Sequence, residues 1–502
     1  MLDAPQSYFD AIGTVLVGAV IVALPVVFHL ANQAAAIALC VLLSVTLSFI
    51  RAASIPVVLV VAYLFQNLFV ALLSPYIQGN EQLNTIRAYN FLMTASIWLV
   101  LTAGYWLNRR HLDRRVRLAA DCTTGALVLI GVYFVIGLAS HAESAVTYLR
   151  NIAAPFLLFQ VCLLSAQRSP LEFTKPLVVI AALATAYGFL ELFAQQELFS
   201  LVNGDVYVGL RIRQEYEAGV WLKQLQQTGY VMRSYLDSLT IDFLNTPLLP
   251  DTNIKLYRLL GPNFHSISFA YALAILAMIL AASRRWIWAI LVLPPLLVIG
   301  SKGALVTFFL VLVFLFLVTR LGLFRNIAWY LVTVTAYAVA GIAIGLRAAD
   351  YHVIGFMGGV RGFLANPLGR GIGAGGNLTL SVSSYDWSRS QELGHTDLAL
   401  ESAAGVLLYQ MGIAGLAILG VLIWIALILW RQFRLSGDHM LAVAALGLLA
   451  VMVNGIFQEE ALFAPLALGL MCAFAGVLLG STYRSTAMGA RVGAHLRPAV
   501  AT

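Results

Sequence analysis

Charged residues are scarce in this sequence. Asp, Glu, Lys and Arg make up only 11% of its 502 residues, whereas 61% are hydrophobic. A soluble globular chain carries about 25% charged and about 45–50% apolar residues, so this composition excludes an ordinary soluble domain. The long apolar runs instead predict an integral membrane protein, in which each helical span takes about 20 residues.

Cysteine is also rare, and motifs for nucleotides or metals are missing. The net charge of +7 comes from short basic clusters between apolar runs. Such clusters are typical of topology signals, so the charge does not indicate a nucleic-acid partner. We expect no cofactor and no metal. The cysteines lie within apolar runs without disulfide or metal-ligand spacing, which predicts buried thiols; they are Cys40, Cys122, Cys162 and Cys472.

The hydrophobic pattern predicts an all-α, polytopic membrane protein with about 14 transmembrane helices. Two long polar loops, 195–263 and 347–402, separate an N-terminal bundle (1–194), a central group of helices (264–346) and a C-terminal group with its tail (403–502). The expected spans lie near 11–31, 33–50, 55–73, 91–107, 122–139, 151–166, 176–194, 264–282, 286–300, 303–320, 327–346, 403–430, 438–454 and 461–480.

The distribution of arginine predicts the orientation of the spans. The segment N-R-R-H-L-D-R-R-V-R (108–117) is the strongest cytoplasmic marker. Counting spans from it places both termini in the cytoplasm and both long loops on the outer face. Within the first loop, apolar residues between Trp221 and Leu239 recur at near-helical spacing. They predict a helix that lies in the membrane interface or packs on the bundle.

The second loop carries the candidate catalytic residues. His395 lies in G-H-T-D, just before an apolar run, and we expect Thr396 or Asp397 to cap the helix there. The helix dipole would then favour a neutral imidazole, which can accept a proton from a hydroxyl. Asp397 and Glu401 are four residues apart, so they would share a helix face and bind sugar hydroxyls or orient His395. The alternative is an interfacial histidine, a capping aspartate and an ion-paired glutamate.

Basic residues supply the candidate binding groups. Arg258, in K-L-Y-R-L-L-G-P-N-F-H, and Lys302, in G-S-K-G, are both expected at the outer face. Cations there suit a pyrophosphate by charge and donor geometry, although Lys302 could also be a snorkelling topology residue. Further candidates are Arg361, Arg211, Arg213 and Arg370.

Glycines crowd the start of the second loop. The segment G-R-G-I-G-A-G-G (369–376) looks like a phosphate-binding loop, but no strand and no dinucleotide-binding unit precede it. A tight, polar turn explains these glycines better.

Four stretches resemble the O-antigen ligase and polysaccharide polymerase superfamily of bacterial inner membranes. Two are F-L-A-N-P-L-G-R-G-I-G-A-G (363–375) and G-H-T-D-L-A-L-E-S-A-A-G-V-L-L-Y-Q-M-G-I-A-G-L (394–416). The others, Y-R-L-L-G-P-N-F-H-S-I-S-F-A (257–270) and I-G-S-K-G-A-L-V (299–306), resemble the Arg-Gly-Asn-rich start of a span and the Ser-Arg-Gly turn of that family. The resemblance covers residues 255–480. It departs at Lys302, where the family has arginine, and at Thr396, where an asparagine usually follows the histidine.

The resemblance implies a metal-independent, inverting glycosyl transfer at the periplasmic face. The donor would be an oligosaccharide on undecaprenyl pyrophosphate. Arg258 and Lys302 match the family's basic positions, and His395 matches its histidine. The implied partners are this lipid-linked glycan, membrane lipids, a flippase and a chain-length regulator. We expect a polymerase of repeat units, because the enlarged outer loops suit two long glycans. A ligase that transfers the glycan to lipid A-core is the alternative, and a transporter or flippase is the alternative of another class.

Overall fold

The computed structural model describes residues 7–170, 173–217, 240–242, 255–379, 385 and 387–495. Within these ranges only the backbone is described for 211–217, 240–242, 255, 319, 323–324 and 486–495. The described residues contain nine helices long and apolar enough to cross a bilayer, together with four shorter apolar helices. The chain is therefore a membrane-embedded helical protein, as its composition predicts.

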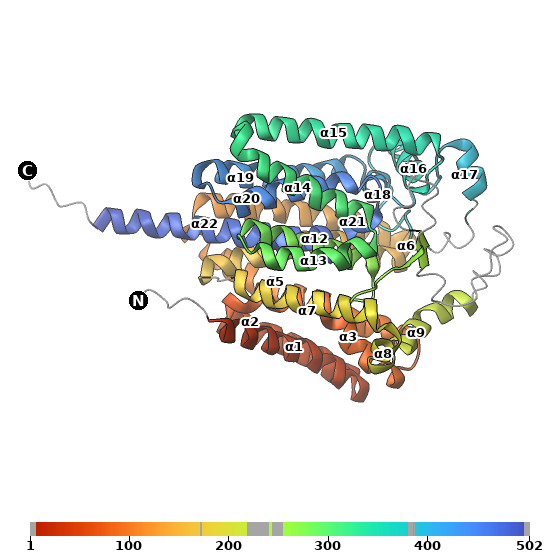
Figure 1. The fold of residues 1–502 in the computed structure, drawn as a ribbon, viewed down its shortest axis with the longest axis horizontal. Coiled ribbons are helices and arrows are strands. Elements are labelled where there is room, and N and C mark those ends of the chain that lie inside the picture. Colours follow the sequence, from red (N-terminus) through yellow and green to blue (C-terminus); the bar gives the residue numbers. More distant parts are fainter. Residues whose placement is uncertain are drawn as a thin grey trace, which may run out of the picture.

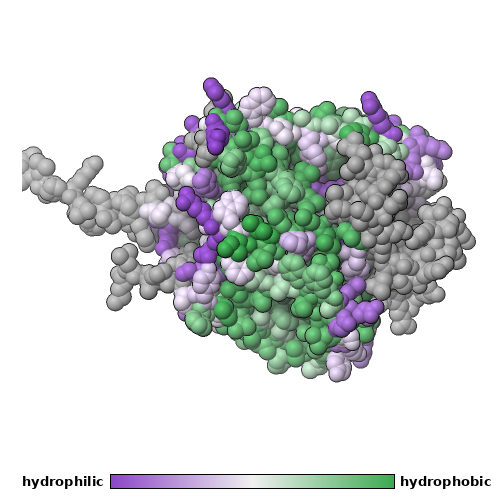
Figure 2. Space-filling model, viewed as in Figure 1, coloured by the Kyte–Doolittle hydropathy of each residue, from purple (hydrophilic) through white to green (hydrophobic). Residues whose placement is uncertain are grey.

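The apolar helices run side by side along the long axis of the molecule (Figure 1). They are α1 (Tyr8–Ala31), α2 (Gln33–Ile50), α3 (Ile55–Leu72), α5 (Tyr89–Asn108), α6 (Arg114–Arg168), α7 (Thr174–Phe193), α12 (Ser266–Ala282), α13 (Trp286–Ile299), α14 (Lys302–Leu321), α15 (Leu323–Arg347), α19 (Ile413–Ser436), α20 (His439–Asn454) and α22 (Leu470–His495). Figure 2 shows the result as a broad apolar belt with polar residues toward both ends.

Short elements gather at one end of the bundle, which we call the loop end, where α8, α9, α16 and α17 lie (Figure 1). The start of α1 and the end of α22 lie at the opposite, terminal end (Figure 1). The shorter elements of the chain are η1 (Ala52–Ser54), η2 (Ser74–Tyr76), α4 (Asn80–Arg87), η3 (Arg109–His111), α8 (Gln195–Leu201), α9 (Gly204–Glu217), β1 (Thr240–Asp242), β2 (Lys255–Tyr257), α16 (Tyr351–Ala365), α17 (Trp387–Leu393), α18 (Ala403–Met411), α21 (Glu459–Phe463) and the π-helical turn η5 (Pro465–Gly469). Strands β1 and β2 pair antiparallel.

Polar residues and glycines end one helix and begin the next. Asn32 separates α1 from α2: its backbone N–H closes α1 on Phe28, and its side chain accepts a hydrogen bond from the Ala35 N–H. Gly437 ends α19 in the left-handed conformation, and Asp438 then caps α20. Each residue satisfies backbone groups that a helix end leaves unpaired, so the chain reverses within one or two residues.

Helix α6 contains two of the expected spans. It is 55 residues long, and His141 interrupts it with φ −142° and ψ 47°. The Gln160 side chain in the second half donates hydrogen bonds to the Thr123 and Thr124 hydroxyls in the first half, at 2.8 and 2.9 Å. The halves therefore lie side by side as a hairpin, close to the predicted spans 122–139 and 151–166.

Two C-terminal spans are less regular than the sequence predicts. The span expected near 403–430 is broken at Gly412 (φ 56°) into α18 and α19. The span expected near 461–480 starts instead with α21, continues through the π-helical turn η5 and only then enters α22. The interfacial helix expected between Trp221 and Leu239 lies outside the described residues.

The bundle core is packed through small residues. Helix α12 lies at its centre, where almost every residue of the helix is buried. Gly476 and Gly480 bring α22 so close to α6 that a Cβ at Gly476 would overlap the Phe159 carbonyl oxygen. Because lipid is as apolar as the helix surfaces, such close van der Waals packing is the main source of helix association in a membrane.

Candidate functional site

The turn that carries Arg258 is fixed by a buried carboxylate. Glu191 on α7 is fully buried, and its carboxylate oxygens accept hydrogen bonds from the Leu260 and Gly261 backbone N–H groups at 2.6 and 2.8 Å. Gly261 has φ +70°, and a Cβ there would overlap the Phe269 ring. The turn before α12 is therefore held at the loop end with little freedom.

Arg258 is half-buried at this turn. Its Nε is shielded from solvent and has no hydrogen-bond acceptor among the described residues. Burial lowers the pKa of Arg258, an effect that the nearby Glu460 carboxylate opposes. The guanidinium stays protonated in any protein, so this position holds a fixed positive charge with at least one unused donor.

Lys302 is the first residue of α14 and is exposed. Its ammonium interacts electrostatically with Asp350, the residue that caps α16. The next residue, Gly303, packs so closely on Gln458 that a Cβ would overlap the Gln458 side-chain oxygen. The Gly303 carbonyl also accepts a hydrogen bond from the Asn454 amide at 2.7 Å. Lys302 therefore lies beside the turn that joins α20 to α21.

That turn carries the acids Glu459 and Glu460, and we call residues 454–460 the acidic turn. Glu459 is only 7% exposed. Its carboxylate accepts hydrogen bonds from the Tyr148 hydroxyl at 2.7 Å and from the Asn377 N–H at 3.3 Å. Burial raises the pKa of Glu459 to about 8. Arg258 and Lys302 thus border one turn, although they come from different elements.

Asn377 connects the acidic turn to Glu401. Its backbone N–H donates to Glu459, and its side-chain oxygen accepts from the Glu401 N–H at 3.0 Å. Glu401 in turn contacts His352 on α16: the His352 Nδ1 lies 3.1 Å from the Glu401 carbonyl oxygen and 3.7 Å from its carboxylate. The backbone N–H of His352 donates to the Asp350 carboxylate at 3.0 Å. A continuous polar cluster therefore runs from Arg258 to His352.

The structure corrects the expected surroundings of His395. Helix α18 begins at Ala403 and is capped by Ser402, not by Thr396 or Asp397. His395 is therefore in a loop rather than at a helix N-terminus, and the argument from the helix dipole was wrong. The loop runs along α16, where the Thr396 N–H donates to the Ile354 carbonyl at 3.1 Å.

Asp397 and Glu401 do not share a helix face, which was a second wrong prediction. Both precede α18, and Glu401 has φ +62°. Asp397 is exposed, and its backbone N–H donates to the Tyr385 hydroxyl at 2.9 Å. The carboxylate of Glu401 faces His352 instead of orienting His395.

The remaining arginine candidates lie in different settings. Arg361 is exposed on α16. Arg370 stacks over the Tyr409 ring, with its Cζ 4.1 Å from the ring centroid, and donates to the Gly362 carbonyl at 2.9 Å. Arg211 lies on α9, where only the backbone is described. Among the predicted basic residues whose side chains are described, Arg258 and Lys302 are the two that border the acidic turn.

The glycine-rich segment forms a turn, as its sequence predicts. Gly369, Gly371, Gly373 and Gly376 all have positive φ. Most of its backbone N–H groups already have protein acceptors; those of Arg370 and Gly371, for example, donate to the Gln410 carbonyl, each at 2.9 Å. They are therefore not available to surround a phosphate, and the segment serves as a structural wedge between α6 and the α18–α19 break.

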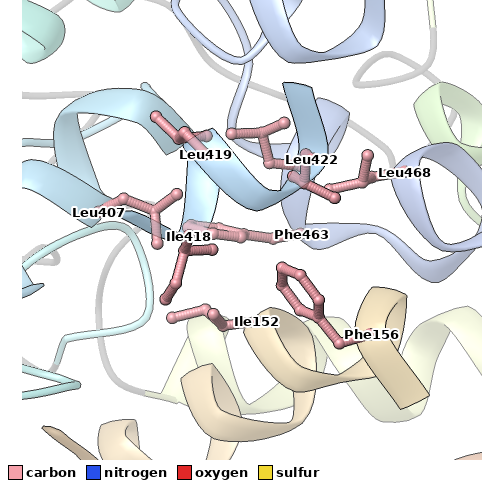
Figure 3. Close-up of a pocket in the computed structure, with 9 residues that line it drawn as sticks. Ile152, Phe156, Leu407, Ile418, Leu419, Leu422, Phe463 and Leu468 are labelled. Carbon is pink, nitrogen blue, oxygen red and sulfur yellow. The ribbon is translucent and has the colours of Figure 1, made fainter. Parts of the chain in front are cut away.

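A small apolar cavity lies among the helices of the bundle. Side chains from α6, α18, α19, α21 and η5 surround it (Figure 3). Its volume of about 10 Å³ is about the least that holds one water molecule, so it cannot hold a sugar. The lining residues are Ile152, Phe156, Leu407, Ile418, Leu419, Leu422, Leu462, Phe463 and Leu468.

No family model matches the chain, and no curated protein matches it. In the part of the chain that the structure describes, no three His, Cys, Asp or Glu side chains gather in a way that could hold a metal ion.

Sequence reasoning missed His352, Tyr148 and the two acids of the acidic turn. A signal for Glu459 and Glu460 was present, because they are adjacent acids between two apolar spans, where ionisable residues are costly. Nothing comparable marked His352, since its partner Glu401 lies 49 positions away in the sequence.

Proposed function

We propose that this protein is a polymerase of the bacterial inner membrane that joins oligosaccharide repeat units carried on undecaprenyl pyrophosphate. The observation that carries the proposal is the approach of Arg258 and Lys302 to one acidic turn at the loop end. A lipid-borne donor requires an enzyme embedded in the membrane. Its diphosphate leaving group requires cations at the membrane surface, and these two side chains provide them.

The proposed orientation places the loop end in the periplasm. The arginine cluster between α5 and α6 belongs to the terminal end and favours the cytoplasm for that side. Counting α6 as two crossings, with the other long and short apolar helices as one each, gives about 14 crossings. This count is even, and it agrees with the appearance of both helical termini at one end (Figure 1).

The reaction is an inverting displacement. The acceptor hydroxyl oxygen attacks the anomeric carbon of the donor and forms the new glycosidic bond. The bond from that carbon to the pyrophosphate oxygen breaks, and undecaprenyl pyrophosphate leaves with the electron pair. Arg258 and Lys302 stabilise the charge on this leaving group, and an imidazole accepts the acceptor proton. His352 and His395 are among the histidines of the loop end that could do so.

The test uses the purified protein in proteoliposomes with a synthetic undecaprenyl-pyrophosphate-linked repeat unit. We expect Arg258→Ala and Lys302→Ala each to lower polymer formation by about 100-fold or more, the effect of removing one group that stabilises developing charge. Lys302→Arg should remain active, because a guanidinium also binds phosphate. Arg434→Ala, an exposed arginine at the far end of α19, is the matched control and should leave polymer formation unchanged.

Three outcomes would overturn parts of this proposal. Near-normal polymer formation by both alanine variants would show that Arg258 and Lys302 do not stabilise the leaving group. Transfer of the glycan to lipid A-core, with no joining of repeats, would establish a ligase instead of a polymerase. Movement of labelled lipid-linked sugar across the vesicle, with no sugar joined, would establish a flippase.

A further inference from the structure

The polar cluster contains a histidine whose environment differs from that of His395. His352 lies in the first turn of α16, and its side chain is 39% exposed. One ring nitrogen is held by the protein, since Nδ1 lies 3.1 Å from the Glu401 carbonyl oxygen. The other nitrogen, Nε2, makes no hydrogen bond to a described residue. The imidazole is thus oriented on one side and open on the other.

The contact with Glu401 determines which nitrogen carries the proton. A carbonyl oxygen only accepts hydrogen bonds, so Nδ1 is the donor in the neutral ring and Nε2 keeps its lone pair. The Glu401 carboxylate, 3.7 Å from the same Nδ1, stabilises the ring after it gains a second proton. An imidazole held at Nδ1 by an acceptor and a carboxylate, with Nε2 directed elsewhere, is the arrangement of a general base.

Glu401 is itself held rigidly enough to orient a ring. Its positive φ of 62° is unusual for a residue with a side chain. The hydrogen bond from its N–H to the Asn377 side chain fixes this conformation, and Asn377 is bonded to Glu459. Strained backbone conformations of this kind persist only where the surrounding structure enforces them, and they are common at active sites.

His352 is also close to one of the two proposed leaving-group cations. Asp350, which caps the helix turn of His352, interacts with Lys302. His395 has no comparable support: its ring has no carboxylate or carbonyl partner among the described residues, and it lies in a loop. Other charged residues on the elements that pack against α16 are Arg325 and Arg347 on α15 and Arg389 and Glu392 on α17.

We propose that His352, and not His395, is the base that accepts the proton of the acceptor hydroxyl, with Glu401 as its positioning residue. This assignment rests on the proposed glycosyl transfer. In that step the acceptor O–H bond breaks as its oxygen bonds to the anomeric carbon. The proton goes to Nε2 of His352, and the electron pair of the broken glycosyl bond leaves on the pyrophosphate.

The experiment compares His352→Gln, His395→Gln and Glu401→Gln in the proteoliposome assay. We expect His352→Gln to lower kcat at least 100-fold, as loss of a general base does, with the KM for the lipid-linked donor changed by less than about 3-fold. His395→Gln should stay within about 3-fold of the wild type. Glu401→Gln should lose about 10-fold, because the carbonyl contact to Nδ1 remains.

Two further measurements separate a base from a structural residue. Added imidazole should restore part of the rate of His352→Ala but leave His395→Ala unchanged. The rate of the wild type should fall on acidification, because a protonated imidazole cannot accept the proton, and this fall should be absent from His352→Gln.

The outcomes distinguish this assignment from the proposed function. An active wild type with a nearly normal His352→Gln and an inactive His395→Gln would overturn the assignment while the glycosyl transfer stands. An inactive His352→Gln with a lowered thermal unfolding midpoint and no imidazole rescue would show a structural role and also overturn it. A wild type that joins no sugars would overturn the proposed function, and this assignment with it.

Discussion

The buried carboxyl of Glu459 should make the stability of the protein depend on pH. Burial raises its pKa from an ordinary value of 4.5 to about 8, and the hydrogen bond from Tyr148 opposes this only in part. A carboxyl whose pKa is higher in the folded state binds its proton more tightly there than in the unfolded state. The stabilisation of the folded state by this protonated carboxyl is therefore fully present below about pH 4.5 and is lost as the pH rises through about 8.

The size of the effect follows from the shift. Moving from 4.5 to about 8 corresponds to roughly 5 kcal/mol at about 1.4 kcal/mol per pH unit. Proteins unfold with an entropy of about 2.1 cal/mol/K per residue, which is roughly 1 kcal/mol/K for 502 residues. The unfolding midpoint should therefore fall by up to about 5 °C from this group alone between pH 5 and 9.

The assay is thermal unfolding in detergent micelles from pH 5 to 9. Glu459→Gln keeps the shape of the side chain but cannot titrate, so its midpoint should depend on pH less steeply than that of the wild type. Glu460→Gln, at the half-buried neighbouring position, is the control and should keep most of the wild-type dependence. Parallel curves for the wild type and Glu459→Gln would refute the reasoning.

Two glycine substitutions test how the loop end is held together. In Gly355→Ala the new Cβ would overlap the Leu400 carbonyl oxygen. We therefore expect the free energy of unfolding to fall by about 1–3 kcal/mol and polymer formation to decrease. The control is Gly125→Ala, on an open face of α6, which should be neutral in the same thermal unfolding and activity assays. Gly412→Ala should also destabilise, because its φ of 56° is unfavourable for alanine and its Cβ would overlap the Pro367 carbonyl oxygen; an unchanged unfolding midpoint would contradict the close contact.

The ends of the regular helices could be predicted from sequence where local signals mark them. Helix α13, Trp286–Ile299, agrees with the expected 286–300 to within a residue. Gly300 and Ser301 explain this agreement, since a left-handed glycine ends the helix and the following serine is the N-cap of the next one. Where local signals and hydrophobic length agree, the sequence alone is sufficient.

The site could not be predicted in the same way, because tertiary contacts decide it. Thr396, Asp397 and Ser402 are all good capping residues, and we expected one of the first two to cap the helix. The structure selects Ser402 because the preceding segment is held along α16, where a hydrogen bond joins Thr396 to Ile354 and Leu400 packs on Gly355. The same placement brings Glu401 to His352, a pairing that no spacing rule along the chain could reveal.

The break between α18 and α19 explains why the polar cluster forms where it does. A broken helix leaves backbone groups unpaired, and in an apolar layer these must find partners within the protein. The glycine-rich segment supplies them: the Gln410 carbonyl accepts from Arg370 and Gly371, and the Ile413 N–H donates to the Pro367 carbonyl.

These backbone bonds fix the segment against the bundle, and Asn377 follows directly at its end. Asn377 is thereby placed between Glu459 and Glu401, which it joins by its two hydrogen bonds. The glycines that look like a phosphate loop thus act indirectly. They repair an interrupted span, and through that repair they set the position of the glutamate that holds His352.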